Sequence, residues 1–258
     1  MNKPIVFISH ITEEKDLAYK VKELIEESFL EMMEVFVSSD GESIGAGARW
    51  LDNITDSLNN CSIELILCSP ESVKRPWVNF EAGAGWVRSI PVIPLCHSGM
   101  KPEKLPIPLN MLQAINLNEV SGLKLLAPVL ATAINSRTPK IDFGDFIDYV
   151  KEFEKNYTLG NSFLEMFKII NGPTKELLNS LDKKEAIGIK LGFLDNDIIK
   201  KLKLLEEEKL SGFIEIKVGN SGMVFPKSGG AVTGGDVFLK INDSSVLIEN
   251  KKFLLDNL

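Results

Sequence analysis

The stretch IELILCSPESVKRPWVNFEAGAGW, residues 63–86, joins an apolar run to a sequence with helix-start signals. Residues 63–68 form a short, mostly apolar run, which is typical of a buried strand. Pro76 suits the first position of a helix, where its missing N–H costs nothing. This stretch therefore predicts a strand, a turn and a helix, which is the repeating unit of an α/β fold.

The predicted helix carries an unusual face. Trp77 and Glu81 are four residues apart, so they lie on the same side of a helix, one turn from each other. Ala84 and Gly85 continue that face with almost no side chain. We expect a carboxylate with an aromatic ring on one side and open space on the other, a shape that suits a flat, cationic or sugar-bearing ligand. Taken singly, a Trp or a Glu is more often a core or solvated residue.

Strands and helices alternate over the first half of the chain. The pattern predicts strands at 4–9, 35–37, 62–68, 91–95 and 112–117, and helices at 13–29, 48–58, from 76 onward, and 122–135. Short links between alternating strands and helices predict a five-stranded parallel sheet that is covered on both faces. Right-handed crossovers then give a doubly wound, flavodoxin-like layout, in which ligands bind beyond the carboxyl ends of the strands.

Composition limits the classes of function. The chain has 258 residues and a net charge of -7, which disfavours a general binder of nucleic acid or anionic membrane. No apolar run approaches the roughly 20 residues that span a bilayer, and the N-terminus lacks a signal-peptide core. Three cysteines in or beside apolar runs indicate reduced core residues of a cytoplasmic protein. Because the chain has only two histidines, we expect no metal site.

A glycine-rich loop follows the second predicted strand. Its sequence is SSDGESIGAG, residues 38–47, and it precedes the predicted helix at 48–58. Backbone N–H groups at such a helix start can hold a phosphate, with help from Arg49. A flexible surface loop is an equally good interpretation of the same residues.

The second half of the chain has a different composition. Residues 136–145 are typical of a linker. Helices are predicted at 146–156, 162–170, 174–181 and 195–208, and strands at 213–218, 237–239 and 246–248. Helices followed by a hairpin resemble a winged-helix module, but no arginine follows Arg137, which disfavours DNA reading. We expect a smaller α+β accessory domain that acts as a sensor or oligomerisation module.

Three segments occur together in a recognisable order. They are VFISH at 6–10, the glycine-rich loop, and SPESVKRPWVNFE at 69–81. Together they resemble the TIR domain in its bacterial form, over roughly residues 1–135. We therefore assign residues 1–137 to a TIR domain and residues 145–258 to the accessory domain.

The resemblance implies roles for particular residues. Trp77 to Glu81 is similar to the WxxxE pattern of NAD+-consuming TIR domains, which makes Glu81 the catalytic carboxylate and Trp77 its flanking aromatic. The remaining implied residues fall into a substrate-binding set and a set in the self-association or gating loop. They are Phe7, Ser9, Ser38, Asp40 and Arg49 for the substrate, and Gly41, Ile44, Gly45 and Gly47 for the loop.

The resemblance also implies an activity. A TIR enzyme of this type cleaves the nicotinamide–ribose bond of NAD+, giving nicotinamide and ADP-ribose or a cyclic isomer. NAD+ is then the substrate, and no cofactor is expected. The implied partners are further copies of the chain through TIR–TIR contacts and an activating ligand or protein at the accessory domain, and the implied setting is bacterial defence against phage. The alternative is a non-enzymatic TIR scaffold.

Overall fold

The computed structural model describes residues 3–38, 56–172, 174–181, 186–224 and 232–258. The chain forms two compact units, Met1–Glu154 and Lys155–Leu258. Within the described residues, no helix combines the length and the apolar character needed to cross a membrane.

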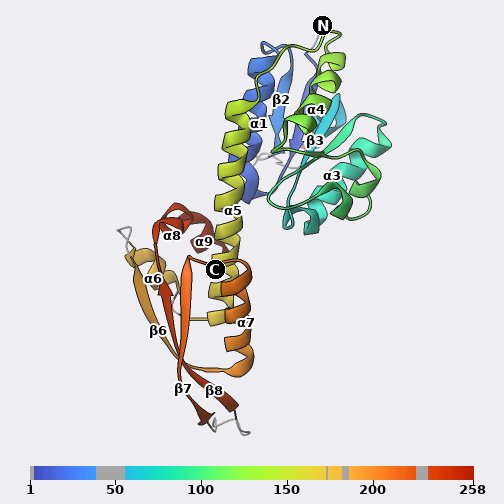
Figure 1. The fold of residues 1–258 in the computed structure, drawn as a ribbon. Helices are drawn as coiled ribbons and strands as arrows, with labels where there is room; N and C mark the ends of the chain where they lie inside the picture. Colours follow the sequence, from blue (N-terminus) through green and yellow to red (C-terminus); the bar gives the residue numbers. More distant parts are fainter. Residues whose placement is uncertain (1–2, 39–55, 173, 182–185, 225–231) are drawn as a thin grey trace, which may run out of the picture. The chain divides into compact units, whose positions relative to one another are not determined.

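A five-stranded parallel sheet forms the centre of the first unit (Figure 1). Its strands are β1 (Ile5–Ser9), β2 (Glu34–Val37), β3 (Ile63–Cys68), β4 (Val92–Cys96) and β5 (Ile115–Asn116), in the spatial order β2-β1-β3-β4-β5. This order confirms the predicted flavodoxin-like sheet. The strand order reverses between β1 and β3, where parallel sheets of this kind hold their ligands.

Each strand sends alternate side chains to opposite faces of the sheet. Val6, Ile8 and Leu65 pack on one face in a core shared with α1 (Lys15–Ser28), α4 (Val120–Ala133) and the first turns of α5 (Gly144–Ile170). Phe7 and Ile66 point to the other face, which α3 (Pro76–Val87) covers. Helix α3 therefore lies against the same face as the odd-numbered residues of β1 and the even-numbered residues of β3.

Short helical turns complete the first unit. They are η1 (Thr12–Glu14), η3 (Ser72–Lys74), η4 (Pro102–Lys104) and η5 (Leu109–Met111). Residues 56–60 are also helical, at the end of the helix predicted at 48–58. The rest of that predicted helix lies outside the described residues.

The two helices predicted at 146–156 and 162–170 are one helix, α5 (Gly144–Ile170, 27 residues), so this prediction was wrong (Figure 1). Its polar middle does not interrupt it, because Ser162 donates to the Thr158 carbonyl and Asn161 donates to the Tyr157 carbonyl. Close packing against Asn250 explains the glycine at position 160. A Cβ at this position would lie 2.7 Å from Asn250 Oδ1.

The second unit contains an antiparallel sheet of three strands. They are β6 (Ile187–Asp195), β7 (Ile214–Val224) and β8 (Val232–Ile241), in the order β6-β8-β7, with helices α6 (Thr174–Ser180), α7 (Asn196–Glu208), α8 (Ser245–Glu249) and α9 (Lys251–Asn257). The sequence reading missed β6 and α9. It also assigned residues 246–248 to a strand, whereas they lie in α8, where the buried Val246 and Leu247 join the core of the unit.

Candidate functional site

Helix α3 presents Glu81 to the carboxyl end of β1. The helix begins at Pro76, as predicted, and buries Val78, Glu81, Ala82 and Gly85 along one face. The indole Nε1 of Trp77 donates to Glu81 Oε1 at 2.7 Å, and Ser9 Oγ donates to Glu81 Oε2 at 2.5 Å. The fold thus brings together three predicted site residues from segments that are about seventy positions apart in the chain.

The predicted open side of the carboxylate is absent. Glu81 has an exposed fraction of 0%, so its carboxyl group is enclosed rather than facing a cavity. Trp77 belongs to an apolar cluster with Phe7, and its ring stacks on Phe80 with centroids 5.2 Å apart. The sequence could not reveal this enclosure, because burial depends on tertiary packing: Ser9, for example, reaches the carboxylate from β1.

Burial changes the acidity of Glu81. Loss of solvent raises its pKa from 4.5 to about 7, while the hydrogen bonds from Ser9 and Trp77 favour the charged form and oppose that rise. A carboxyl group with a pKa near neutrality exists in both protonation states at physiological pH. Such groups are typical of functional sites, although structural networks also produce them.

A second buried carboxyl group lies under the same helix. Glu64, the second residue of β3, has an exposed fraction of 0%, and a Cβ placed on Gly85 would be 2.0 Å from its Oε2. Burial, and next the negative charge of Glu81, raise the pKa of Glu64 to about 8, against a lowering effect of Arg88. Sequence reasoning missed Glu64, although an acid inside an otherwise apolar strand was a visible signal.

The other predicted site residues are partly described. Phe7 is fully buried and stacks on Phe36 with centroids 5.6 Å apart, so it forms the apolar floor near Trp77. Ser38 Oγ accepts a hydrogen bond from the His10 backbone N–H at 3.3 Å. The remaining predicted residues lie outside the described residues: Asp40, Gly41, Ile44, Gly45, Gly47 and Arg49.

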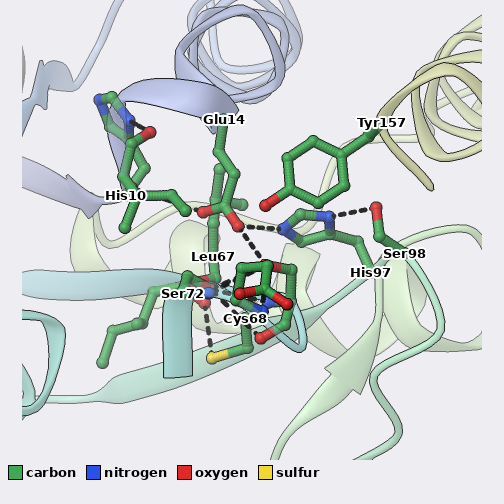
Figure 2. Close-up of polar contacts among 12 residues, drawn as sticks. His10, Glu14, Leu67, Cys68, Ser72, His97, Ser98 and Tyr157 are labelled. Atoms are coloured by element: carbon green, nitrogen blue, oxygen red, sulfur yellow. Dashed lines mark hydrogen bonds and ion pairs between the residues drawn. The ribbon is translucent and has the colours of Figure 1, made fainter. Parts of the chain in front are cut away.

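A separate polar network joins loops at the carboxyl edge of the sheet (Figure 2). Glu14 Oε1 accepts a hydrogen bond from Ser69 Oγ at 2.6 Å and lies 3.3 Å from His97 Nε2. His97 Nδ1 lies 3.0 Å from Ser98 Oγ. These residues follow β1, β3 and β4, so the network links the ends of three strands. In the described part of the chain, no three His, Cys, Asp or Glu side chains are grouped to hold a metal ion.

Comparisons with known proteins identify the first unit. A model of the TIR domain family matches residues 6–127. A search of curated proteins found no match. A solved structure of a metazoan TIR-STING receptor from C. gigas, in complex with 2',3'-cGAMP, is 13% identical, and the match covers 90% of this chain and 72% of that chain with a TM-score of 0.36. Residues 6–127, with the parallel sheet and helix order described above, therefore form a TIR domain.

Proposed function

We propose that this protein is an NAD+ nucleosidase, which cleaves the nicotinamide–ribose bond to give nicotinamide and ADP-ribose or a cyclic ADP-ribose isomer. The observation that carries the proposal is the position of Glu81. Its carboxyl group lies at the carboxyl end of β1, is held by Ser9 and Trp77, and has a pKa of about 7. The Trp77–Glu81 pattern within a TIR domain supports the same assignment.

The chemistry of NAD+ explains how one carboxylate can suffice. Glycosidases use two carboxyl groups because an alkoxide leaving group must be protonated. In NAD+ the nicotinamide ring is a cationic pyridinium, and it becomes a neutral molecule when its bond to the ribose breaks. No acid is therefore needed to protonate this leaving group. The remaining demand is stabilisation of the positive ribosyl oxocarbenium, which an ionised Glu81 supplies by its charge or by forming a covalent bond to the sugar.

Enclosure of Glu81 adds a condition to this proposal. A carboxylate with 0% exposure cannot touch a ribose until the side chains around it move. The bonds from Ser9 and Trp77 therefore hold a resting form, and turnover requires a rearrangement of α3 against the end of β1. Self-association of TIR domains, or a trigger acting through the C-terminal unit, would supply that rearrangement. NAD+ enters as substrate, and the proposal requires no further cofactor.

The test is to incubate concentrated protein with NAD+, with and without a crowding agent, and to separate the products by chromatography and mass spectrometry. We expect loss of NAD+ with release of nicotinamide, and the mass of the second product distinguishes ADP-ribose from a cyclic isomer. Glu81→Gln should abolish the loss. Glu71→Gln is the matched control, because Glu71 is partly exposed and pairs with Lys74 on the same segment.

The burial of Glu81 also favours a second candidate function, a non-enzymatic TIR scaffold. In that case the Ser9–Glu81 bond serves only to fasten α3 to β1, and the Trp77–Glu81 bond orients the carboxyl group within α3. A protein that associates with itself yet leaves NAD+ intact under every condition would support the scaffold and exclude the enzyme. The defensive role against phage belongs to the enzyme proposal. It is tested by plaque counts on bacteria that express the wild type or Glu81→Gln.

A further inference from the structure

Glu64 is a buried carboxyl group that the proposed reaction does not yet use. It is the second residue of β3, a strand whose six residues are all buried. Neither of its carboxyl oxygens has a hydrogen-bond partner among the described residues. Burying a polar group without a partner costs free energy, and a native structure that contains one needs a reason for it.

The backbone places Glu64 beneath α3, one helical turn from Glu81. Phe7 is the β1 neighbour of Glu64, and Ser9, which binds Glu81, follows two residues later on the same face of β1. On α3, Gly85 stands above the Glu64 carboxyl group and follows Glu81 by four residues, which is about 6 Å along a helix. Any side chain at position 85 would meet Glu64 Oε2. The glycine therefore makes the room that this carboxyl group occupies, one helical turn from Glu81.

Among the described residues, few charged or titratable groups surround Glu64. From α3 and its end, Glu81 contributes a negative charge and Arg88 a positive one. The Arg88 guanidinium is already bound to the carbonyls of Leu58 and Cys61 and lies 3.3 Å from Cys61 Sγ, the titratable group of that segment. The flanking positions on β1 and β4 are Phe7 and Val92, which carry no charge.

This inference rests on the proposed NAD+ cleavage. We propose that Glu64, unpartnered among the described residues and one helical turn from Glu81, is a second acidic group of that reaction that does not touch the substrate. While Glu64 is protonated, the charge of the pair stays on Glu81. When Glu64 ionises, it adds a second negative charge that attracts the cationic substrate across the protein interior. The different partners of the two groups explain the assignment. Glu81 receives two hydrogen bonds that favour its carboxylate, and Glu64 receives none within the described residues.

The second charge has a specific kinetic signature. The substrate is cationic before the reaction, at its pyridinium, and in the transition state, at its ribose. A charge that stabilises both states equally lowers KM and leaves kcat nearly unchanged. Acting across a protein interior, one additional charge of this kind should raise kcat/KM by on the order of tenfold.

The experiment measures kcat and KM for NAD+ across the pH range in which both carboxyl groups titrate. We expect kcat/KM of the wild type to rise in two steps, the second through KM alone. Glu64→Gln should keep the first step and lose the second, and Glu71→Gln should keep both. A single step in the wild type, or a loss of kcat in Glu64→Gln that is equal at every pH, would overturn the inference.

Two further measurements separate the possible failures. Infrared difference spectra at neutral pH should show a protonated buried carboxyl signal from Glu64 beside that of the half-titrated Glu81. The Glu64 signal should persist in Glu81→Gln and disappear in Glu64→Gln, which keeps only the Glu81 signal. Absence of the Glu64 signal from the wild type overturns the inference whatever the activity. If Glu64→Gln does not fold, Glu64→Leu suits an apolar strand and should also lack the second step. A wild type that never consumes NAD+ defeats the proposed function itself, whereas an active wild type without the second step defeats only the role of Glu64.

Discussion

Two buried acidic sites in the TIR domain have opposite surroundings. Glu14 accepts a hydrogen bond from Ser69, lies against His97 and approaches the Ile11 backbone N–H at 3.5 Å. Glu64 is equally buried, yet its oxygens have no partner among the described residues, and Glu81 depends on two donors. The comparison teaches that burial alone does not assign a role. The Glu14 network ties strand ends together, whereas the Glu64 and Glu81 pair keeps two acids poised to change charge near neutrality.

The largest expected effect is a loss of enzymatic activity, and we expect it at Glu81 and not at Glu14. Glu81→Gln should lower the rate of NAD+ loss by roughly 10²–10³-fold or more, because it removes the charge that faces the oxocarbenium. Its thermal unfolding should stay close to that of the wild type, since an amide still fits between Ser9 and Trp77. The measurement is turnover by chromatography beside a melting curve. Unchanged turnover in a purified, folded Glu81→Gln protein would remove the catalytic assignment.

A substitution at the other site, Glu14→Gln, should affect stability rather than activity. Glu14→Gln replaces a carboxylate, which binds Ser69 and faces His97, by an amide that presents an NH₂ group to one of its neighbours. Breaking a buried network of this kind should lower the free energy of unfolding by about 2–4 kcal/mol. Denaturation in urea measures it. A stable Glu14→Gln protein with impaired turnover would reverse the roles that the comparison gives to the two sites.

The close approach of α3 to Glu64 can be tested by glycine substitutions. In Gly85→Ala the new Cβ would lie 2.0 Å from Glu64 Oε2 and 2.7 Å from Val92 Cγ2, so we expect a loss of about 1–3 kcal/mol. Gly83→Ala is the matched control. It meets nothing within 4 Å and should be neutral or stabilising by up to about 1 kcal/mol.

A double-mutant cycle then tests whether Glu64 is the obstacle. The loss caused by Gly85→Ala should be smaller in a Glu64→Ala background, because the nearest atom is gone, although Val92 still restricts the site. Strict additivity of the two substitutions would show that Glu64 does not occupy the space beneath Gly85.

The last prediction concerns the pH dependence of stability. The pKa of Glu64 is raised from 4.5 to about 8 and that of Glu81 from 4.5 to about 7. The folded state therefore binds more protons than the unfolded state between these values. The stability that these groups contribute is full below about pH 4.5 and declines as pH rises through 7 and 8. Each group contributes a slope of about 1.4 kcal/mol per pH unit at most.

Glu64→Gln should remove its share of that slope. As pH rises from weakly acidic to weakly alkaline, the free energy of unfolding of Glu64→Gln should fall less than that of the wild type. Glu71→Gln should follow the wild type. Urea denaturation at several pH values measures the difference. Parallel curves for Glu64→Gln and the wild type would mean that Glu64 titrates normally in the folded protein.

The C-terminal unit marks where sequence reasoning failed on secondary structure. The sequence predicted separate helices at 146–156 and 162–170, but α5 continues through the residues between them. There Asn161 and Ser162 donate to carbonyls one turn earlier, and Gly160 accommodates Asn250. Residues 246–248 are apolar and β-branched in part, which predicted a strand. A run of three apolar residues fits a buried strand or a buried helical turn equally well, and packing decided for the helix.

The sequence by itself determined the parallel sheet, the order of its elements and the helix that begins at Pro76, because apolar periodicity and proline act locally. It also placed Ser9, Trp77 and Glu81 among the site residues. Only the tertiary structure decided that Glu81 is enclosed and that Glu64 lies beneath the same helix. Both facts depend on how α3 packs on β1 and β3, and the protonation of a carboxyl group follows from the solvent and charges around it, which come from residues far apart in the chain.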